Sequence, residues 1–172
     1  MIPEIKNILY ATDLSKNSSY AFLYAVDMAH RHQAKIVILH SVEPVRYLNS
    51  EAMSYRLMEL MEKAKKAEQE MDFEEIKKKL REFCEKIEKK ISFSCTDLVS
   101  KILVPVGHPV EEILNAADQE GCDAIVLGTH GKGFLKHTFL GSVAESVLSR
   151  SRKPVLVVPL PSEKTNLDWD EI

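Results

Sequence analysis

The chain has few of the residues that mark disulfide-rich or membrane proteins. Its 172 residues include three cysteines, Cys84, Cys95 and Cys122, an odd number with no close spacing. This argues against a secreted disulfide scaffold and favours reduced thiols in a cytosol. No segment has the length and apolarity of a membrane span, and the N-terminus lacks a cationic and apolar signal. We therefore expect a cytoplasmic protein.

An excess of basic residues is also absent, since the formal net charge is −3. Nucleic acids and anionic membranes attract basic patches or stripes, so neither is an expected partner. With 45% hydrophobic and 28% charged residues, the composition is that of an ordinary globular protein with one sizeable core. We expect a single domain over residues 1–160 and a polar tail over residues 161–172.

Several catalytic motifs are missing. The sequence contains no Gly-x4-Gly-Lys-[Ser/Thr] loop, and the turn after its first expected strand lacks Gly-x-Gly-x-x-Gly. These absences argue against a kinase or a dehydrogenase. The six histidines form no His-Glu-x-x-His or Cys/His pattern, so a zinc site is not expected. No base or water-orienting residue for phosphoryl transfer stands out either.

What the chain does contain is an alternation of apolar runs and helical patterns. The predicted strands are residues 5–11, 35–42, 99–106, 123–127 and 154–158, and the predicted helices are residues 15–31, 109–119 and a segment that begins at Ser142. Residues 44–90 carry apolar residues at helical spacing and predict two further helical pieces, whose balanced charges form either a solvated face or a docking surface. Such alternation predicts an α/β fold with a doubly wound parallel sheet, covered by helices on both faces.

Glycines follow the fourth predicted strand at a spacing typical of an anion site. Gly128 and Gly131 permit positive φ and close approach of a ligand to the backbone. Ser142 and Glu145 match a capping box that starts the next helix, whose free N–H groups favour a phosphate. Lys132 lies between these parts and adds a cation. The alternative is that the glycines only turn the chain and that Ser142 only caps its helix.

The spacing Gly128-x2-Gly131-x9-Gly141-Ser142 resembles the nucleotide-binding signature of the ATP-binding branch of the universal stress proteins. Residues 8–15, 40–42, 106–109 and 153–159 are similar to other parts of that family in order and position, so the resemblance covers nearly the whole chain. It implies a Rossmann-like sheet of the adenine nucleotide alpha hydrolase-like type, with strand order 3-2-1-4-5. It also implies a homodimer that pairs through Val155, Leu156, Val157 and Val158.

In that topology the loop after the first strand opens beside the glycine loop, and the two form one cleft. Asp13 is placed to accept hydrogen bonds from a ribose or to hold Mg²⁺, and its alternative role is a local turn or helix cap. Val42 resembles the position whose backbone meets the adenine, and Ala11 stands where relatives often have proline. The expected contacts to ATP, ADP or AMP are Ala11, Thr12, Asp13, Val42, Gly128, Thr129, His130, Gly131, Lys132, Gly141, Ser142 and Val143.

Two functions follow from this resemblance. The first is a homodimeric ATP-binding module in stress response or signalling, with little turnover. The second is a slow Mg²⁺-dependent ATPase or nucleotide hydrolase that uses Asp13 and His130. A signalling receiver is disfavoured, because the third predicted strand ends without an acceptor aspartate.

Overall fold

The computed structural model describes residues 2–43, 73–129 and 140–159. In these ranges strands and helices alternate as predicted, and a further helix spans residues 73–88. The first helical piece predicted within residues 44–90 and the C-terminal tail lie outside the described residues. The elements are β1 (Asn7–Ala11), α1 (Lys16–His32), β2 (Lys35–Leu39), β3 (Val99–Leu103), α3 (Pro109–Gln119), β4 (Ala124–Gly128), α4 (Ser142–Arg150) and β5 (Val155–Val158).

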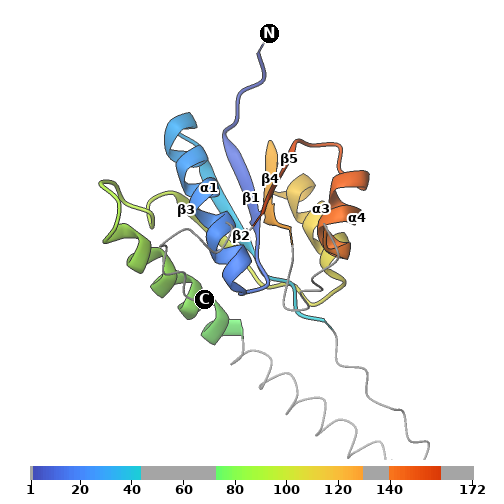
Figure 1. Ribbon diagram of the computed structural model, residues 1–172, viewed down its shortest axis with the longest axis horizontal. Helices are drawn as coiled ribbons and strands as arrows, with labels where there is room; N and C mark the ends of the chain where they lie inside the picture. The colour runs from blue at the N-terminus through green and yellow to red at the C-terminus, as the bar shows by residue number, and fades with distance from the viewer. Residues whose placement is uncertain (1, 44–72, 130–139, 160–172) are drawn as a thin grey trace, which may run out of the picture.

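The five strands form one parallel sheet in the order β3-β2-β1-β4-β5 (Figure 1). This order confirms the expectation. In the register, Ile8 of β1 lies opposite Ile36 of β2 and Ala124 of β4. The carboxyl ends of these three central strands therefore meet at one edge of the sheet, where parallel α/β sheets bind their ligands.

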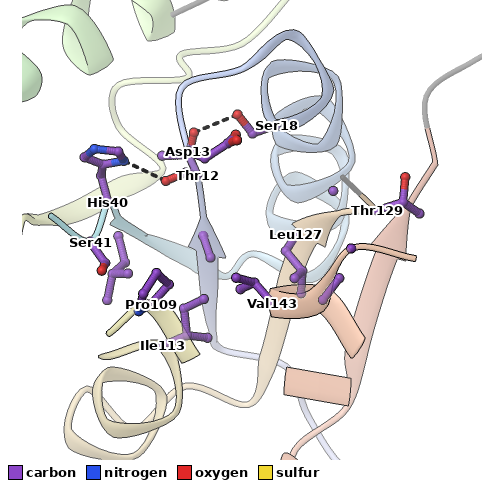
Figure 2. Close-up of a pocket in the computed structure, with 15 residues that line it drawn as sticks. Thr12, Asp13, Ser18, His40, Ser41, Pro109, Ile113, Leu127, Thr129 and Val143 are labelled. Atoms are coloured by element: carbon purple, nitrogen blue, oxygen red, sulfur yellow. Dashed lines mark hydrogen bonds between the residues drawn. The ribbon is translucent and has the colours of Figure 1, made fainter. Parts of the chain in front are cut away.

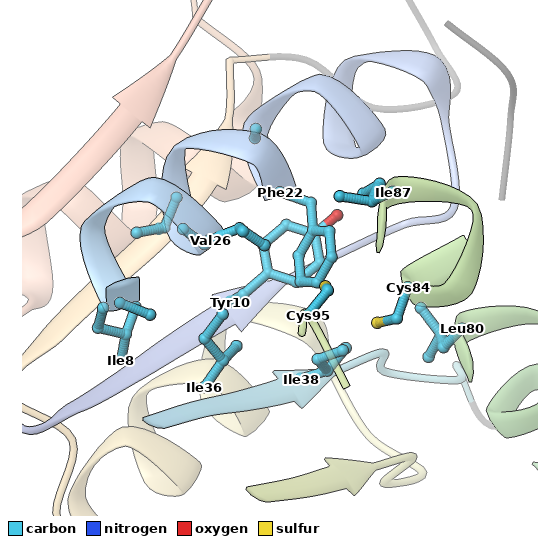
Figure 3. Close-up of a cluster of buried hydrophobic side chains, with 14 of the residues drawn as sticks. Ile8, Tyr10, Phe22, Val26, Ile36, Ile38, Leu80, Cys84, Ile87 and Cys95 are labelled. Carbon is cyan, nitrogen blue, oxygen red and sulfur yellow. The ribbon is translucent and has the colours of Figure 1, made fainter. Parts of the chain in front are cut away.

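Alternate side chains of the central strands point into two separate cores. Ile8 and Tyr10 pack with α1 and the helix over residues 73–88 (Figure 3), while Leu9 and Ala11 pack with α3 and α4. Strands buried on both faces are typical of parallel sheets, which explains why their sequences are apolar runs. The helices consequently form one layer on each side of the sheet.

Strands β2 and β3 end earlier than predicted. They stop at Leu39 and Leu103, and beyond them Val42 and Val106 form only an isolated parallel bridge. The ladder breaks because Pro105 has no N–H to donate after the bond from the His40 N–H to the Leu103 carbonyl (3.0 Å).

Two of the three cysteines lie together in the core. Cys84, from the helix over residues 73–88, and Cys95 are both buried in the α1-side core (Figure 3). The Cys95 thiol and burial raise the pKa of Cys84, so Cys84 behaves as a structural thiol rather than a nucleophile. No helix within the described ranges is long and apolar enough to cross a membrane.

A carboxylate ties the amino ends of the two central strands together. Asp123 Oδ2 accepts the backbone N–H groups of Lys6 (2.8 Å) and Asn7 (2.9 Å), and these bonds lower the pKa of Asp123. Replacing Asp123 with alanine should lower the free energy of unfolding at pH 7 by about 1–3 kcal/mol, because two donors lose their acceptor. Urea denaturation would measure the difference.

The same variant has a predictable pH dependence. Because the folded-state pKa of Asp123 lies below its unfolded value, its stabilisation is present above the unfolded pKa of about 3.9 and is lost as the pH falls through the folded pKa. The stability difference between the wild type and Asp123→Ala should therefore shrink toward pH 3. A difference that stayed constant would show that the charged carboxylate contributes nothing.

Candidate functional site

A cavity of about 180 Å³ opens at the carboxyl ends of β1, β2 and β4 (Figure 2). Its floor is formed by the ends of these strands, and its walls by the first turns of α1, α3 and α4. The first turn of a helix carries N–H groups without intrahelical partners and a partial positive charge. The surroundings therefore favour a ligand with anionic groups.

The structure brings most of the predicted site residues to this cavity. Val42 instead lines an adjoining hollow, and Ser142 lies exposed at the start of α4 without lining the cavity. His130, Gly131 and Lys132 lie outside the described residues. The predicted residues that line the cavity are Ala11, Thr12, Asp13, Gly128, Thr129, Gly141 and Val143.

One carboxylate oxygen of Asp13 accepts hydrogen bonds, and the other has no partner among the described residues. Its Oδ1 accepts from the backbone N–H of Ser15 (3.1 Å) and from the Ser15 hydroxyl (2.6 Å), which forms the local turn considered as its alternative role. Its Oδ2 is buried and makes no hydrogen bond to any residue that the structure describes. Buried polar atoms without partners are rare because desolvation is costly, and they mark places where a ligand supplies the missing bond. Asp13 can thus hold the loop and accept from a ligand at once.

The rest of the β1–α1 loop is locked around Asp13. Leu14 adopts a left-handed φ of 65°, which is uncommon for a residue with a branched side chain. The Thr12 hydroxyl accepts from the Leu14 N–H (3.0 Å) and donates to the Ser18 hydroxyl (2.9 Å). These bonds hold a strained backbone in place beside the cavity, as is common at binding sites.

His40 lines the cavity, although the sequence analysis placed it only in the family-like segment 40–42 and not among the expected ligand contacts. Its Nδ1 lies 2.8 Å from the Thr12 carbonyl oxygen, so its ring is fixed against the β1–α1 loop (Figure 2). Its position in the sequence could have indicated this place, because His40 directly follows β2 and so lies at the carboxyl end of a central strand.

Gly128 has a different reason to be glycine from the one expected. Its φ is not in the left-handed region, where Gly121 is the glycine found among the described residues. A Cβ on Gly128 would lie 2.6 Å from Asn17 Oδ1. The absent side chain therefore makes room for α1, and the prediction that Gly128 serves a positive φ is wrong.

The predicted capping box at Ser142 is also wrong. Gly141 is the N-cap of α4, with φ −70° and ψ 152°, and no described side chain caps the helix. Ser142 is already the first helical residue, and the extended backbone that a cap requires belongs to Gly141. The Gly141 N–H donates to the Thr129 carbonyl (2.7 Å), so the two ends of the glycine motif meet at the cavity.

A second hollow of about 590 Å³ adjoins the cavity and shares Asp13, His40, Ser41 and Pro109 with it. It extends past Val42 to the helix over residues 73–88, and Phe73, Ile76 and Lys79 are among the residues that line it. Sites for small molecules usually occupy about 300–1,000 Å³. A nucleotide-sized ligand would therefore have to extend from the cavity into this hollow.

The family of this chain follows from comparison with known proteins. The universal stress protein family matches residues 4–159. The chain belongs to this family. Universal stress protein MJ0577 of Methanocaldococcus jannaschii is 35% identical over 156 residues, which cover 89% of this chain and 94% of the relative. A solved structure of MJ0577 superposes with a TM-score of 0.70 at 29% identity, over 94% of this chain and 100% of that chain.

More distant members of the family have been solved with nucleotides. A universal stress protein in complex with cAMP has a TM-score of 0.59 at 22% identity, and the two chains are covered to 91% and 98%. The universal stress protein from Archaeoglobus fulgidus in complex with dAMP has a TM-score of 0.53 at 20% identity, with coverage of 92% and 99%. At these identities the likeness establishes the shared fold.

Proposed function

We propose that this universal stress protein binds an adenine nucleotide, ATP included, at the carboxyl ends of β1, β2 and β4, as in the ATP-binding branch of its family. The observation that carries the proposal is the buried Asp13 Oδ2, an acceptor without a partner in a cavity bordered by three helix starts. The glycine spacing and the cAMP and dAMP complexes of distant relatives support the same class of ligand.

Each part of a nucleotide has a matching environment. The start of α4 offers N–H donors that no side chain caps, which suits the phosphates. Asp13 Oδ2 can accept a hydrogen bond from a ribose hydroxyl. The hollow beside Val42 and Ile76 offers apolar surface for the base. His130, Gly131 and Lys132 remain predicted phosphate contacts.

Asp13 also fits a magnesium ion that accompanies the phosphates. Mg²⁺ binds through one or two carboxylates together with phosphate oxygens and water. Within the described ranges no group of three or more His, Cys, Asp or Glu could hold a metal ion, so a magnesium ion held by Asp13 would take most of its other ligands from phosphates and water.

The protein is also proposed to be a homodimer that pairs through β5. This strand lies at one edge of the sheet, and the Leu156 side chain is 39% exposed there. An apolar edge strand left open invites uncontrolled pairing, and a two-fold contact with a second copy would cover it.

Isothermal titration calorimetry of nucleotide-free protein with Mg-ATP tests the binding proposal. Asp13→Asn keeps Oδ1 for the Ser15 turn but replaces Oδ2 with an NH2 group, which cannot accept a hydrogen bond. A hydrogen bond to a charged group contributes about 1.5–3 kcal/mol. The Kd should therefore rise about tenfold to a hundredfold.

Asp97→Asn is the matched control, because Asp97 is an exposed carboxylate in the loop before β3. It should bind like the wild type. Repeating the titration with EDTA separates the two roles of Asp13, since a metal role predicts that EDTA weakens the wild type but not Asp13→Asn. Absence of binding to the wild type, or equal Kd values for the wild type and Asp13→Asn, would refute the proposal. Chromatography of the recovered nucleotide reports any hydrolysis.

A further inference from the structure

Asn17 occupies a buried polar junction where four elements meet. It lies in the first turn of α1 and is only 3% exposed. Around it are the last residue of β4, the last residue of β5 and Thr129, whose carbonyl oxygen accepts from the N-cap of α4. Buried side-chain amides are nearly always hydrogen-bonded, so we expect Asn17 to satisfy the polar groups around it.

The first contact of Asn17 is with Gly128. The position that a Cβ of Gly128 would take lies 2.6 Å from Asn17 Oδ1 and 2.9 Å from Asn17 Cγ. Any side chain at residue 128 would therefore have to displace the amide group. The short asparagine and the glycine are a matched pair that lets α1 approach the end of β4 closely.

The second set of contacts reaches the glycine loop and the edge strand. Asn17 Oδ1 accepts from the Thr129 hydroxyl (3.4 Å), and Asn17 Nδ2 donates to the Val158 carbonyl (3.4 Å). The same Val158 carbonyl accepts the Thr129 N–H (3.0 Å). One amide thus joins the start of α1 to the ends of β4 and β5.

These contacts lie directly behind two walls of the cavity. Thr12, Asp13 and Ser18 line it from the side of α1, and Gly128 and Thr129 line it from the side of β4. Asn17 does not line the cavity itself. From the first turn of α1 its side chain contacts Gly128 and Thr129, which form the β4 side of the cavity. The separation between Asp13 and the glycine loop therefore depends on how Asn17 packs.

We propose that Asn17 is a positioning residue for the nucleotide site, which sets the distance between the Asp13 loop and Gly128–Thr129. This inference rests on the proposed nucleotide binding. It explains the glycine at residue 128 by its close contact with Asn17 of α1. It also makes the affinity for a nucleotide depend on the Asn17 side chain, which does not line the cavity.

A double-variant experiment tests the contact without any ligand. Gly128→Ala should lower the melting temperature, because its methyl group displaces Asn17. Asn17→Ala/Gly128→Ala should melt at a higher temperature than Gly128→Ala alone, because the smaller residue 17 makes room for the methyl group. If Gly128→Ala does not fold, recovery of a cooperative transition in the double variant supports the same contact. Melting shifts that simply add would overturn it.

Nucleotide affinity distinguishes a positioning role from a purely structural one. With folded protein at 10 °C below each melting midpoint or lower, Asn17→Ala should raise the Kd for Mg-ATP by about twofold to thirtyfold. Ser19→Ala is the control, since Ser19 is fully buried in the same turn and, among the described residues, its hydroxyl donates only to the Ser15 carbonyl (3.2 Å). It should lower stability but leave the Kd unchanged.

An unchanged Kd in Asn17→Ala would overturn the positioning role, as would an equal rise in Ser19→Ala. If the wild type binds no adenine nucleotide, the proposed function fails, whereas the melting comparison without ligand still decides whether Asn17 and Gly128 are a matched pair.

Discussion

Replacing Phe22 with alanine should lower the free energy of unfolding by about 3–5 kcal/mol, the usual loss for a buried phenylalanine. Phe22 is fully buried on α1. Its ring packs against Tyr10 on β1 (Figure 3), with the ring centroids 4.8 Å apart. The ring centroid of Phe83, on the helix over residues 73–88, lies 5.6 Å from that of Phe22. One ring therefore joins the sheet to both helices that cover this face.

Urea denaturation at pH 7 would measure this loss. Phe22→Leu is the control, because it keeps most of the apolar volume and should cost less than half as much. A loss in Phe22→Ala below about 1 kcal/mol, the typical effect of an ordinary substitution, would mean that the helix over residues 73–88 contributes little to the core. The same helix lines the hollow beside the cavity, so Phe22→Ala should also weaken the proposed nucleotide binding.

Replacing Leu156 with lysine should convert the proposed dimer into a monomer. Leu156 lies on the edge strand β5 and is exposed in a single chain, so the substitution should leave the fold intact. In a two-fold contact every substitution occurs twice, and like charges brought together cost several kcal/mol. The dimer dissociation constant should therefore rise by more than about a hundredfold.

Sedimentation equilibrium over a range of protein concentrations would measure that change. Val106→Lys is the matched control, because Val106 is 43% exposed but follows β3, the strand at the opposite edge of the sheet. It should leave the dimer unchanged. A wild-type chain that sediments as a monomer at all concentrations, or a Leu156→Lys variant that remains a dimer, would show that β5 is not the contact.

Most of the fold could be predicted from the sequence, because a parallel sheet has a direct signature. The central strands are buried on both faces, which makes each of them an apolar run, and helical spacing between the runs identifies the crossovers. Strand order came from the family resemblance. The early ends of β2 and β3 depended on one missing N–H at Pro105, and the sequence analysis extended both strands past it.

The candidate site was predicted less completely, because sequence motifs do not say why a residue is present. Gly128 fits the motif and lines the cavity, yet its missing side chain accommodates Asn17, a residue 111 positions earlier in the chain. Ser142 matches a capping box, but the turn begins one residue earlier and Gly141 takes the cap. His40 lies in the family-like segment 40–42 but was not among the expected contacts, and it reaches the site because it directly follows β2, which lies beside β1.

The hydrogen bonds of Asp123 to Lys6 and Asn7 lie at the amino ends of β1 and β4, and the cavity lies at their carboxyl ends. Strand β1 has five residues, and at a rise of about 3.3 Å per residue the two ends are separated by roughly 16 Å. This separation is about twice the Debye length of about 8 Å at physiological ionic strength. Solvent-exposed charges introduced around Asp123 are therefore largely screened from the phosphates of the proposed nucleotide. The amino-terminal edge of the sheet can be altered for thermal tolerance or solubility while ligand preference stays independent of those changes.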